Sequence, residues 1–345
     1  MSRAGHAIAL LAVGALLAAC SGAPDAGSGR SPQPRPASSS ATSGTPTDSA
    51  SVVPEPDPVS LPALAQKSFD GSRLRLGEEV LRTATQRQYR VTYRSGGLTI
   101  SGRIAVPVGD GPFPAVVLAH GYIDPAVYSN GQGLTREREW LADHGYVALH
   151  VDYRGHAESS PDRSRGLDMR MGYTEDVVNA VLALRAWRGP VDDDRVALVG
   201  RSMGGGIVMN VLAAKPGLVR AGVAFAPVSS DAVDNFDRWV REAPGRGGIA
   251  ALVLRRYGEP ADNPDFWAGI SARTYFGDVT EPVLIHHGTA DDTCPLRWSR
   301  ETARLMRAAG VDVTLRTYPG EGHAFGPQFE LSMQRTDRFL ARSMG

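Results

Sequence analysis

From about residue 80 onward, short apolar runs alternate with segments of helical periodicity, and no other feature constrains the fold as strongly. The runs consist largely of Val, Ile, Leu and Ala, and helical segments separate most of them; examples are residues 113–121, 146–155, 195–200 and 281–288. Strands that are apolar throughout are buried on both faces, and helices between such strands indicate a parallel sheet covered on both sides. The pattern predicts a doubly wound α/β domain over residues 80–345, with a mostly parallel sheet.

Two segments depart from this alternation. Residues 87–95 and 98–107 predict two paired strands around a turn at Gly96-Gly97. Residues 231–274 contain two tryptophans and several glycines and prolines, and they interrupt the rhythm of strands and helices. An insertion at the C-terminal edge of such a sheet predicts a small cap or lid. We call residues 231–274 the cap.

The first 19 residues have the pattern of an export signal: Arg3, then an apolar run of signal-peptide length, then small residues. The end of this run, Leu17-Ala18-Ala19-Cys20, resembles the processing box of bacterial lipoproteins. The resemblance implies cleavage before Cys20, acylation of that cysteine, and an exported protein anchored to the membrane by lipid. The anchor would lie in the outer face of the cytoplasmic membrane, or in an outer membrane if the organism has one. An ordinary secretory signal with a chance cysteine is the alternative.

Residues 20–62 are rich in Ser, Pro, Gly, Ala and Thr, and they contain few large apolar side chains. Such a segment cannot bury enough surface to fold, so we expect a disordered tether. With Cys20 acylated, Cys294 has no intramolecular partner, because the chain has only two cysteines. The chain has 37 basic and 37 acidic residues, and this balance gives no net field toward nucleic acid.

Ser202 lies between glycines at the end of the apolar run 195–200, in the sequence GRSMGGG. In a doubly wound sheet, chemistry gathers at the C-terminal ends of the strands. A serine in a sharp turn there needs small neighbours, which Gly200 and Gly204 provide, and the turn exposes its hydroxyl. The pattern predicts a nucleophile whose neighbour, Met203, offers a backbone N–H at a helix N-terminus.

A serine nucleophile needs a base, usually a histidine oriented by a carboxylate. Of eight histidines, His323 lies in the sequence YPGEGHAFG after the last predicted strand, at the expected edge of the sheet. Asp291 and Asp292 lie in the loop after the preceding strand. The chain order is therefore Ser202, then an aspartate, then His323, which is the order of the α/β hydrolases.

Three motifs together, GRSMGGG, HHGTADDTCP and GEGHAF, resemble the catalytic domain of the prolyl oligopeptidase family of serine peptidases, within the α/β-hydrolase superfamily. The resemblance covers about residues 85–343. In that family the acid stands four residues before a proline, which implies Asp291 before Pro295 and leaves Asp292 as a neighbour. The family usually has valine where this chain has Cys294.

The resemblance also implies an oxyanion hole from the backbone N–H groups of Met203 and Tyr122. His323 would take the proton of Ser202 during attack on a carbonyl carbon, Asp291 would orient the imidazole, and water would release the acyl-enzyme. No metal or cofactor is expected. A metal cluster of His286, His287, Asp291 and Asp292 is the weaker interpretation, because alternate strand residues face opposite sides of a sheet and the cluster would leave Ser202 and His323 unexplained.

Three functions remain open at this point. A serine hydrolase that cleaves peptide or amide bonds is the first, but full members of the family carry a β-propeller that filters peptides. A carboxylesterase that acts on small acyl esters is the close alternative, because a domain with only a small cap is equally compatible with esters. A non-catalytic surface binding protein is the third, although such proteins usually lack part of the triad. The substrate is therefore a peptide or an ester, and the oligomeric state is left open.

The lipid anchor rests on a single side chain, so we expect Cys20→Ser to abolish lipid attachment and membrane retention. Metabolic labelling with a fatty acid, followed by membrane fractionation, measures both. A Cys20→Ser protein that is processed normally and stays with the membrane contradicts this interpretation, and Cys294→Ser serves as the matched control.

Overall fold

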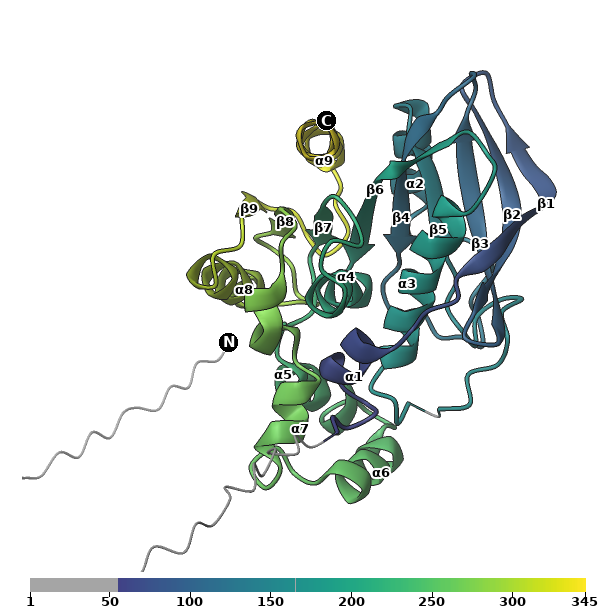
Figure 1. Cartoon of the computed structure of the whole chain (residues 1–345). Coiled ribbons are helices and arrows are strands. Elements are labelled where there is room, and N and C mark those ends of the chain that lie inside the picture. The colour runs from purple at the N-terminus through teal and green to yellow at the C-terminus, as the bar shows by residue number, and fades with distance from the viewer. Residues whose placement is uncertain (1–54, 165) are drawn as a thin grey trace, which may run out of the picture. The chain divides into compact units, whose positions relative to one another are not determined.

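The computed structural model describes residues 55–164 and 166–345 (Figure 1). The predicted signal segment and nearly all of the predicted tether lie outside these described residues. The described strands are β1 (Ser72–Arg82), β2 (Gln86–Ser95), β3 (Leu98–Pro107), β4 (Phe113–Ala119), β5 (Val147–Val151), β6 (Val191–Arg201), β7 (Gly222–Phe225), β8 (Val283–Gly288) and β9 (Val313–Tyr318). The described helices are α1 (Leu61–Gln66), α2 (Thr135–Asp143), α3 (Met171–Arg185), α4 (Met203–Ala214), α5 (Ala232–Phe236), α6 (Gly247–Tyr257), α7 (Pro264–Gly269), α8 (Leu296–Ala308) and α9 (Phe329–Met344).

The strands form a single nine-stranded sheet with the order β1-β2-β3-β5-β4-β6-β7-β8-β9. Neighbouring strands are antiparallel from β1 to β5 and parallel from β5 to β9. The β2–β3 hairpin turns at Gly96 and Gly97, as the sequence predicts. The predicted class, a mostly parallel α/β sheet, is confirmed.

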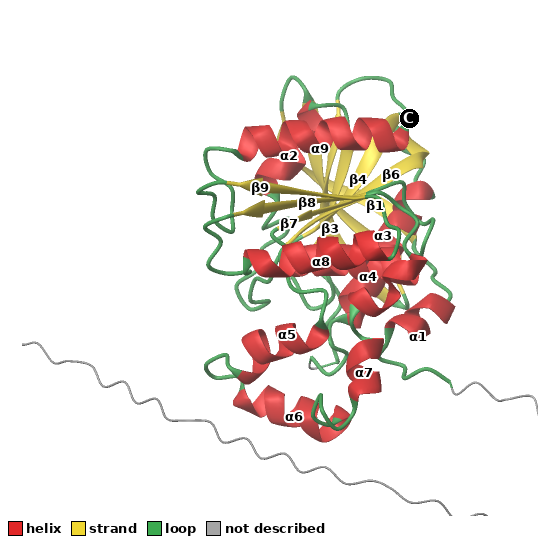
Figure 2. Cartoon of the chain, turned by 90° about the vertical axis from the view of Figure 1, so that its left-hand side faces the viewer, coloured by secondary structure: helices red, strands yellow, loops and turns green. Residues whose placement is uncertain are grey.

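Helices cover both faces of the sheet, with α2 and α9 on one face and α3, α4 and α8 on the other (Figure 2). The central strand β4 contributes side chains to the apolar cores on both faces of the sheet. Ala115, Val117 and Ala119 belong to the core beneath α3 and α4, whereas Val116 and Leu118 belong to the core beneath α2 and α9. All five side chains are fully buried, which explains why this strand is apolar throughout.

The packed part of the chain begins earlier than the predicted boundary at residue 80. Helix α1 is capped by Ser60, whose hydroxyl accepts the backbone N–H of Ala63 at 3.1 Å. Leu61 and Leu64 of this helix are 1% and 3% exposed and join the main core. Edge strand β1 follows, with mostly exposed side chains. A six-residue helix and an exposed edge strand carry too little apolar periodicity to be recognised in the sequence.

In Figure 2 the helices of the cap form a group below α4 and α8. It contains α5, α6, α7 and a π-helical turn at Asp237–Arg241, and its last segment continues as a 3₁₀ helix at Ala272–Asp278. Its apolar side chains Phe236 and Trp267 are almost fully buried and belong to the same apolar core as residues of α3 and α4, so the cap is packed onto the domain. Within the described residues, no helix has the length and apolar character needed to cross a membrane.

Candidate active site

Ser202 is the single residue between strand β6 and helix α4, and its backbone is strained. Its φ and ψ angles are 57° and −121°, in a region that side-chain-bearing residues seldom adopt. The backbone on both sides is fixed, since the Ser202 N–H donates to Phe225 O at 2.9 Å and the Val228 N–H donates to Ser202 O at 3.1 Å. The turn therefore holds the serine at the C-terminal edge of the sheet, half-buried.

Two glycines permit this turn by allowing backbone segments to approach closely. A Cβ atom on Gly204 would lie 1.8 Å from the carbonyl oxygen of Ala119, in the neighbouring strand. A Cβ atom on Gly200 would lie 2.3 Å from the carbonyl oxygen of Gly204. Neither position has room for a side chain, so both predicted elbow glycines are explained by the packing of α4 against the sheet.

Asp291 and His323 meet at the same edge of the sheet, in the loops after β8 and β9. The Nδ1 atom of His323 lies 2.9 Å from Oδ2 of Asp291. The Asp291 side chain is fully buried, whereas the His323 side chain is 22% exposed. Because Nδ1–H donates to the carboxylate, Nε2 of His323 is the nitrogen left to accept a proton.

The Asp291 carboxylate is fully engaged by donors around it. One oxygen accepts the backbone N–H groups of Thr293 and Cys294, each at 2.9 Å. The other oxygen faces His323 and also Nε2 of His287, at 3.2 Å. Burial alone would raise the pKa of Asp291, but the hydrogen bonds from His287 and His323 outweigh it and hold the pKa well below its usual range. Asp291 therefore remains a carboxylate throughout the neutral pH range.

The environments of the two candidate acids, Asp291 and Asp292, differ. Asp292 is exposed, and its side chain accepts only the hydroxyl of Thr293, at 3.2 Å, within the described part of the chain.

The hydroxyl of Ser202 lies 3.9 Å from the sulfur of Cys294. Among residues 55–164 and 166–345, no hydrogen bond joins Ser202 to His323. Catalytic hydrogen bonds of this kind are often long until substrate binds.

The two backbone groups expected to form an oxyanion hole lie beside Ser202. Met203 is the first residue of α4, so its N–H has no acceptor within the helix. A Cβ atom on Gly121 would lie 3.1 Å from Cβ of Ser202, so the backbone leading into Tyr122 passes directly against the serine. The Tyr122 hydroxyl points elsewhere, toward Arg246, whose Nη2 donates to it at 2.6 Å.

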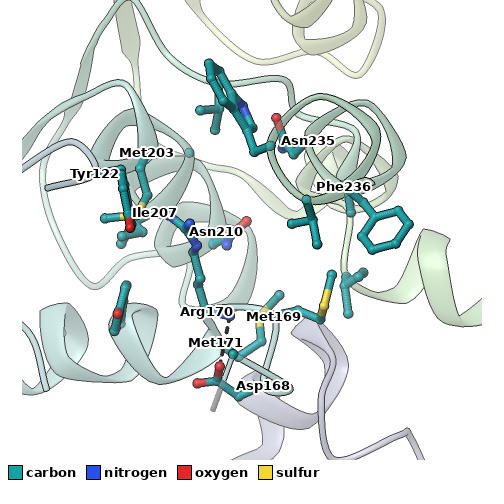
Figure 3. Close-up of a pocket in the computed structure, with 18 of the residues that line it drawn as sticks. Tyr122, Asp168, Met169, Arg170, Met171, Met203, Ile207, Asn210, Asn235 and Phe236 are labelled. Carbon is teal, nitrogen blue, oxygen red and sulfur yellow. Dashed lines mark hydrogen bonds between the residues drawn. The ribbon is translucent and has the colours of Figure 1, made fainter. Parts of the chain in front are cut away.

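A cavity of about 350 Å³ opens beside this constellation (Figure 3). Its walls come from one face of α4, the segment before α3, and the cap. The lining residues include Tyr122, Arg170, Met203, Ile207, Asn210 and Arg246. In Figure 3 the Arg170 side chain extends from the level of Asp168 toward Met203 and Tyr122. The cavity is large enough for a small acyl group or one or two amino-acid residues.

Three positions around the site carry no signal strong enough for the sequence to assign them. Glu321 is 3% exposed and accepts the backbone N–H groups of Gly326 and Gln328, which fixes the loop of His323. Arg238 in the cap donates to the carbonyl oxygens of Asp292 and Thr293, each at 3.0 Å, and so ties the cap to the loop that holds the acid.

The third position that the sequence does not assign is His287. Its ring nitrogens form hydrogen bonds with Cys294 O at 2.9 Å and Ser299 Oγ at 2.7 Å, which hold the loop of Asp291 in place. Its neighbour His286 faces the other side of the sheet and contacts Tyr318 and Thr336. In the part of the chain that the structure describes, no group of three or more His, Cys, Asp or Glu side chains is arranged to hold a metal ion.

Comparison with known proteins decides the family. The model of the prolyl oligopeptidase family, Peptidase S9, matches residues 133–345. The chain belongs to the prolyl oligopeptidase family. It is therefore a member of a family of serine hydrolases, and the matched region contains Ser202, Asp291 and His323.

Curated relatives of this family member include exopeptidases. Dipeptidyl aminopeptidase BIII of Pseudoxanthomonas mexicana is 27% identical over 242 residues, which cover 68% of this chain and 34% of the relative. Dipeptidyl peptidase 4 of Felis catus is 31% identical over 203 residues, covering 56% of this chain and 24% of the relative. The chain thus spans about a third or less of the length of these two relatives.

Solved structures with the same fold include an esterase and a peptidase. The acetyl xylan esterase from Paenibacillus sp. R4 has a TM-score of 0.62 at 21% identity, covering 82% of this chain and 92% of the esterase. A Mycobacterium tuberculosis puromycin-hydrolyzing peptidase has a TM-score of 0.61 at 19% identity, covering 77% of this chain and 41% of the peptidase. Both matches support the α/β-hydrolase fold.

The different environments of the two aspartates lead to a direct comparison of variants. We expect Asp291→Asn to lower kcat by about 10³- to 10⁴-fold, because the amide cannot hold the His323 tautomer or stabilise the imidazolium. Asp292→Asn, its matched control in an exposed position, should stay within a few-fold of the wild type. Steady-state hydrolysis of an activated ester measures the kcat of both variants. A larger loss of kcat in Asp292→Asn than in Asp291→Asn would show that Asp291 is not the acid.

Proposed function

We propose that this protein is a serine hydrolase that forms an acyl-enzyme on Ser202, with His323 as general base and Asp291 as its orienting acid. The observation that carries the proposal is the hydrogen bond between His323 Nδ1 and Asp291 at 2.9 Å, on the sheet edge where Ser202 has a strained backbone. A buried carboxylate, an imidazole whose Nε2 can accept a proton and a serine hydroxyl at the sheet edge are the parts that nucleophilic acyl transfer needs.

In the first half of the reaction, Ser202 Oγ attacks the carbonyl carbon while His323 Nε2 takes the hydroxyl proton. The carbonyl oxygen becomes an oxyanion, and the N–H groups of Met203 and Tyr122 receive it. Loss of one such donor typically raises the barrier by about 3 to 4 kcal/mol. His323 then gives its proton to the leaving nitrogen or oxygen, and the bond to the acyl carbon breaks.

In the second half, water takes the place of the leaving group. His323 accepts a proton from water as the water oxygen attacks the acyl carbon, and it returns that proton to Ser202 Oγ when the ester bond breaks. The products are a carboxylic acid and the free enzyme. The Asp291 carboxylate stays ionised throughout and stabilises the imidazolium in both halves.

Peptide or amide substrates are our first candidates, since the curated relatives are named as dipeptidyl peptidases and the same histidine can protonate an amine leaving group. A carboxylesterase is the second candidate. Its support is the cavity beside Met203, which the cap of this chain helps to line and whose volume of about 350 Å³ suits a small acyl group. We further propose that the enzyme acts outside the cytoplasm, anchored through lipid on Cys20.

Two substrate panels distinguish the candidates, with Ser202→Ala protein as the blank in both. One panel contains 4-nitrophenyl esters of increasing acyl length, and the other contains peptide 4-nitroanilides with Pro, Ala or Arg before the scissile bond. A peptidase should cleave an anilide with a clear preference for one residue, measured as kcat/KM. Ester turnover without anilide cleavage would identify a carboxylesterase, and wild-type rates equal to the Ser202→Ala blank on both panels would refute the proposed function.

A further inference from the structure

The cavity beside Ser202 lies on the acyl side of the scissile bond. The leaving group must receive its proton from His323, so it lies on the side of the loops after β8 and β9. None of the cavity's described lining residues comes from these two loops, so the cavity is assigned to the acyl part of the substrate. It begins at Tyr122 and Met203, whose N–H groups would hold the carbonyl oxygen, so the rest of the acyl group extends into it.

Two arginines project into this cavity near its reactive end. Nη1 of Arg170 contacts the sulfur of Met203, and its guanidinium carbon lies 5.2 Å from the centre of the Tyr122 ring. The guanidinium carbon of Arg246 lies 5.0 Å from the centre of the same ring. Both guanidinium groups therefore lie around the Tyr122 ring. Tyr122 directly follows Gly121, whose backbone lies against Ser202.

Neither guanidinium forms an ion pair with a carboxylate of the described residues, although Asp168 lies in the same cavity wall as Arg170. Within residues 55–164 and 166–345, no carboxylate oxygen lies within 4.0 Å of a nitrogen of either guanidinium. The two aspartates that line the cavity bind backbone instead. Asp168 accepts the N–H groups of Arg170 and Gly172 at 3.1 and 3.0 Å, and Asp162 accepts the N–H of Ser164 at 2.8 Å.

The donors of these two side chains are also largely unused. A guanidinium has five N–H donors and no acceptor. The side-chain partners of Arg170 and Arg246 in the described structure are a thioether sulfur, which is a weak acceptor, and the hydroxyl of Tyr122. Burial, together with the positive charge of Arg246, lowers the pKa of Arg170, although the guanidinium stays charged at neutral pH. An anion between the two would relieve their repulsion and use their donors.

We propose that Arg170 and Arg246 bind a carboxylate on the acyl part of the substrate, so that the enzyme prefers acyl groups that carry a second, free carboxylate. This inference rests on the proposed function, because it assigns the acyl side from the position of His323. An aliphatic diacid attached through one end, or an acyl residue with an acidic side chain, has the required chemistry. Guanidinium and carboxylate pair through two parallel hydrogen bonds, which makes the preference geometric as well as electrostatic.

The test compares two esters that differ only in charge: 4-nitrophenyl hydrogen adipate and its methyl ester. We expect wild-type protein to have a kcat/KM at least about tenfold higher for the anionic ester, which is the effect of one charge-assisted hydrogen bond. Arg170→Gln and Arg246→Gln should each lower the ratio of the two kcat/KM values several-fold, and the double variant should bring it close to one. Arg246→Lys should keep part of the preference, since the charge remains.

The matched control is Arg255→Gln, which removes the same charge from an exposed position on cap helix α6. This variant should keep the wild-type ratio, and circular dichroism should show native helix content in every variant. A wild-type ratio near one, or a ratio that survives in the double variant, would overturn the proposal. Turnover of the neutral ester reports on the proposed function separately.

A binding measurement keeps the inference testable in the absence of turnover. Monomethyl adipate should bind to full-length Ser202→Ala protein at least about tenfold more tightly than dimethyl adipate in isothermal titration calorimetry. The difference should shrink when Arg170 and Arg246 are both replaced by Gln. Equal affinity for the two compounds would overturn the proposal, whatever the activity of the wild-type enzyme.

Discussion

The close approach of helix α4 to strand β4 is the constraint on which the site depends. The Gly204 backbone lies so near Ala119 that an added Cβ would be 1.8 Å from its carbonyl oxygen. This packing forces the chain to turn within one residue, and Ser202 has the strained φ of 57° as a result. The turn aligns the start of α4 with the serine, so its first N–H groups face the place where an oxyanion would form. Strain of this kind persists only where surrounding contacts determine the conformation.

The remaining groups are fixed by buried polar contacts at the same edge of the sheet. Asp291 accepts hydrogen bonds on both oxygens, and Glu321 binds the backbone of the His323 loop. On the other side of Ser202, the buried Asp152 accepts Tyr128 and Asn130 at 2.7 Å each and so secures the chain that follows β4. Each of these loops is therefore held by a buried carboxylate that has its donors, which keeps the site residues in place without a substrate.

The sequence predicts the sheet, and the sheet edge at which the candidate residues lie, for clear physical reasons. Strands buried on both faces must be apolar throughout, and Ser202, Asp291 and His323 follow strands whose C-terminal ends meet at one edge. Short or exposed elements lack a continuous apolar run, so the sequence does not predict α1 and β1. Arg170 and Arg246 were not predicted either. They lie in irregular segments 76 residues apart in the chain, and only the folding of the cap over α4 brings both to Tyr122.

Acylation of Ser202 is the step on which the proposed function depends. The most direct measurement is reaction with a fluorophosphonate, followed by mass spectrometry of the intact chain and of its peptides. We expect one phosphonate per chain, located on Ser202, and no labelling of Ser202→Ala protein. An adduct on a different residue of the wild-type protein, or equal labelling of the Ser202→Ala protein, would contradict this expectation.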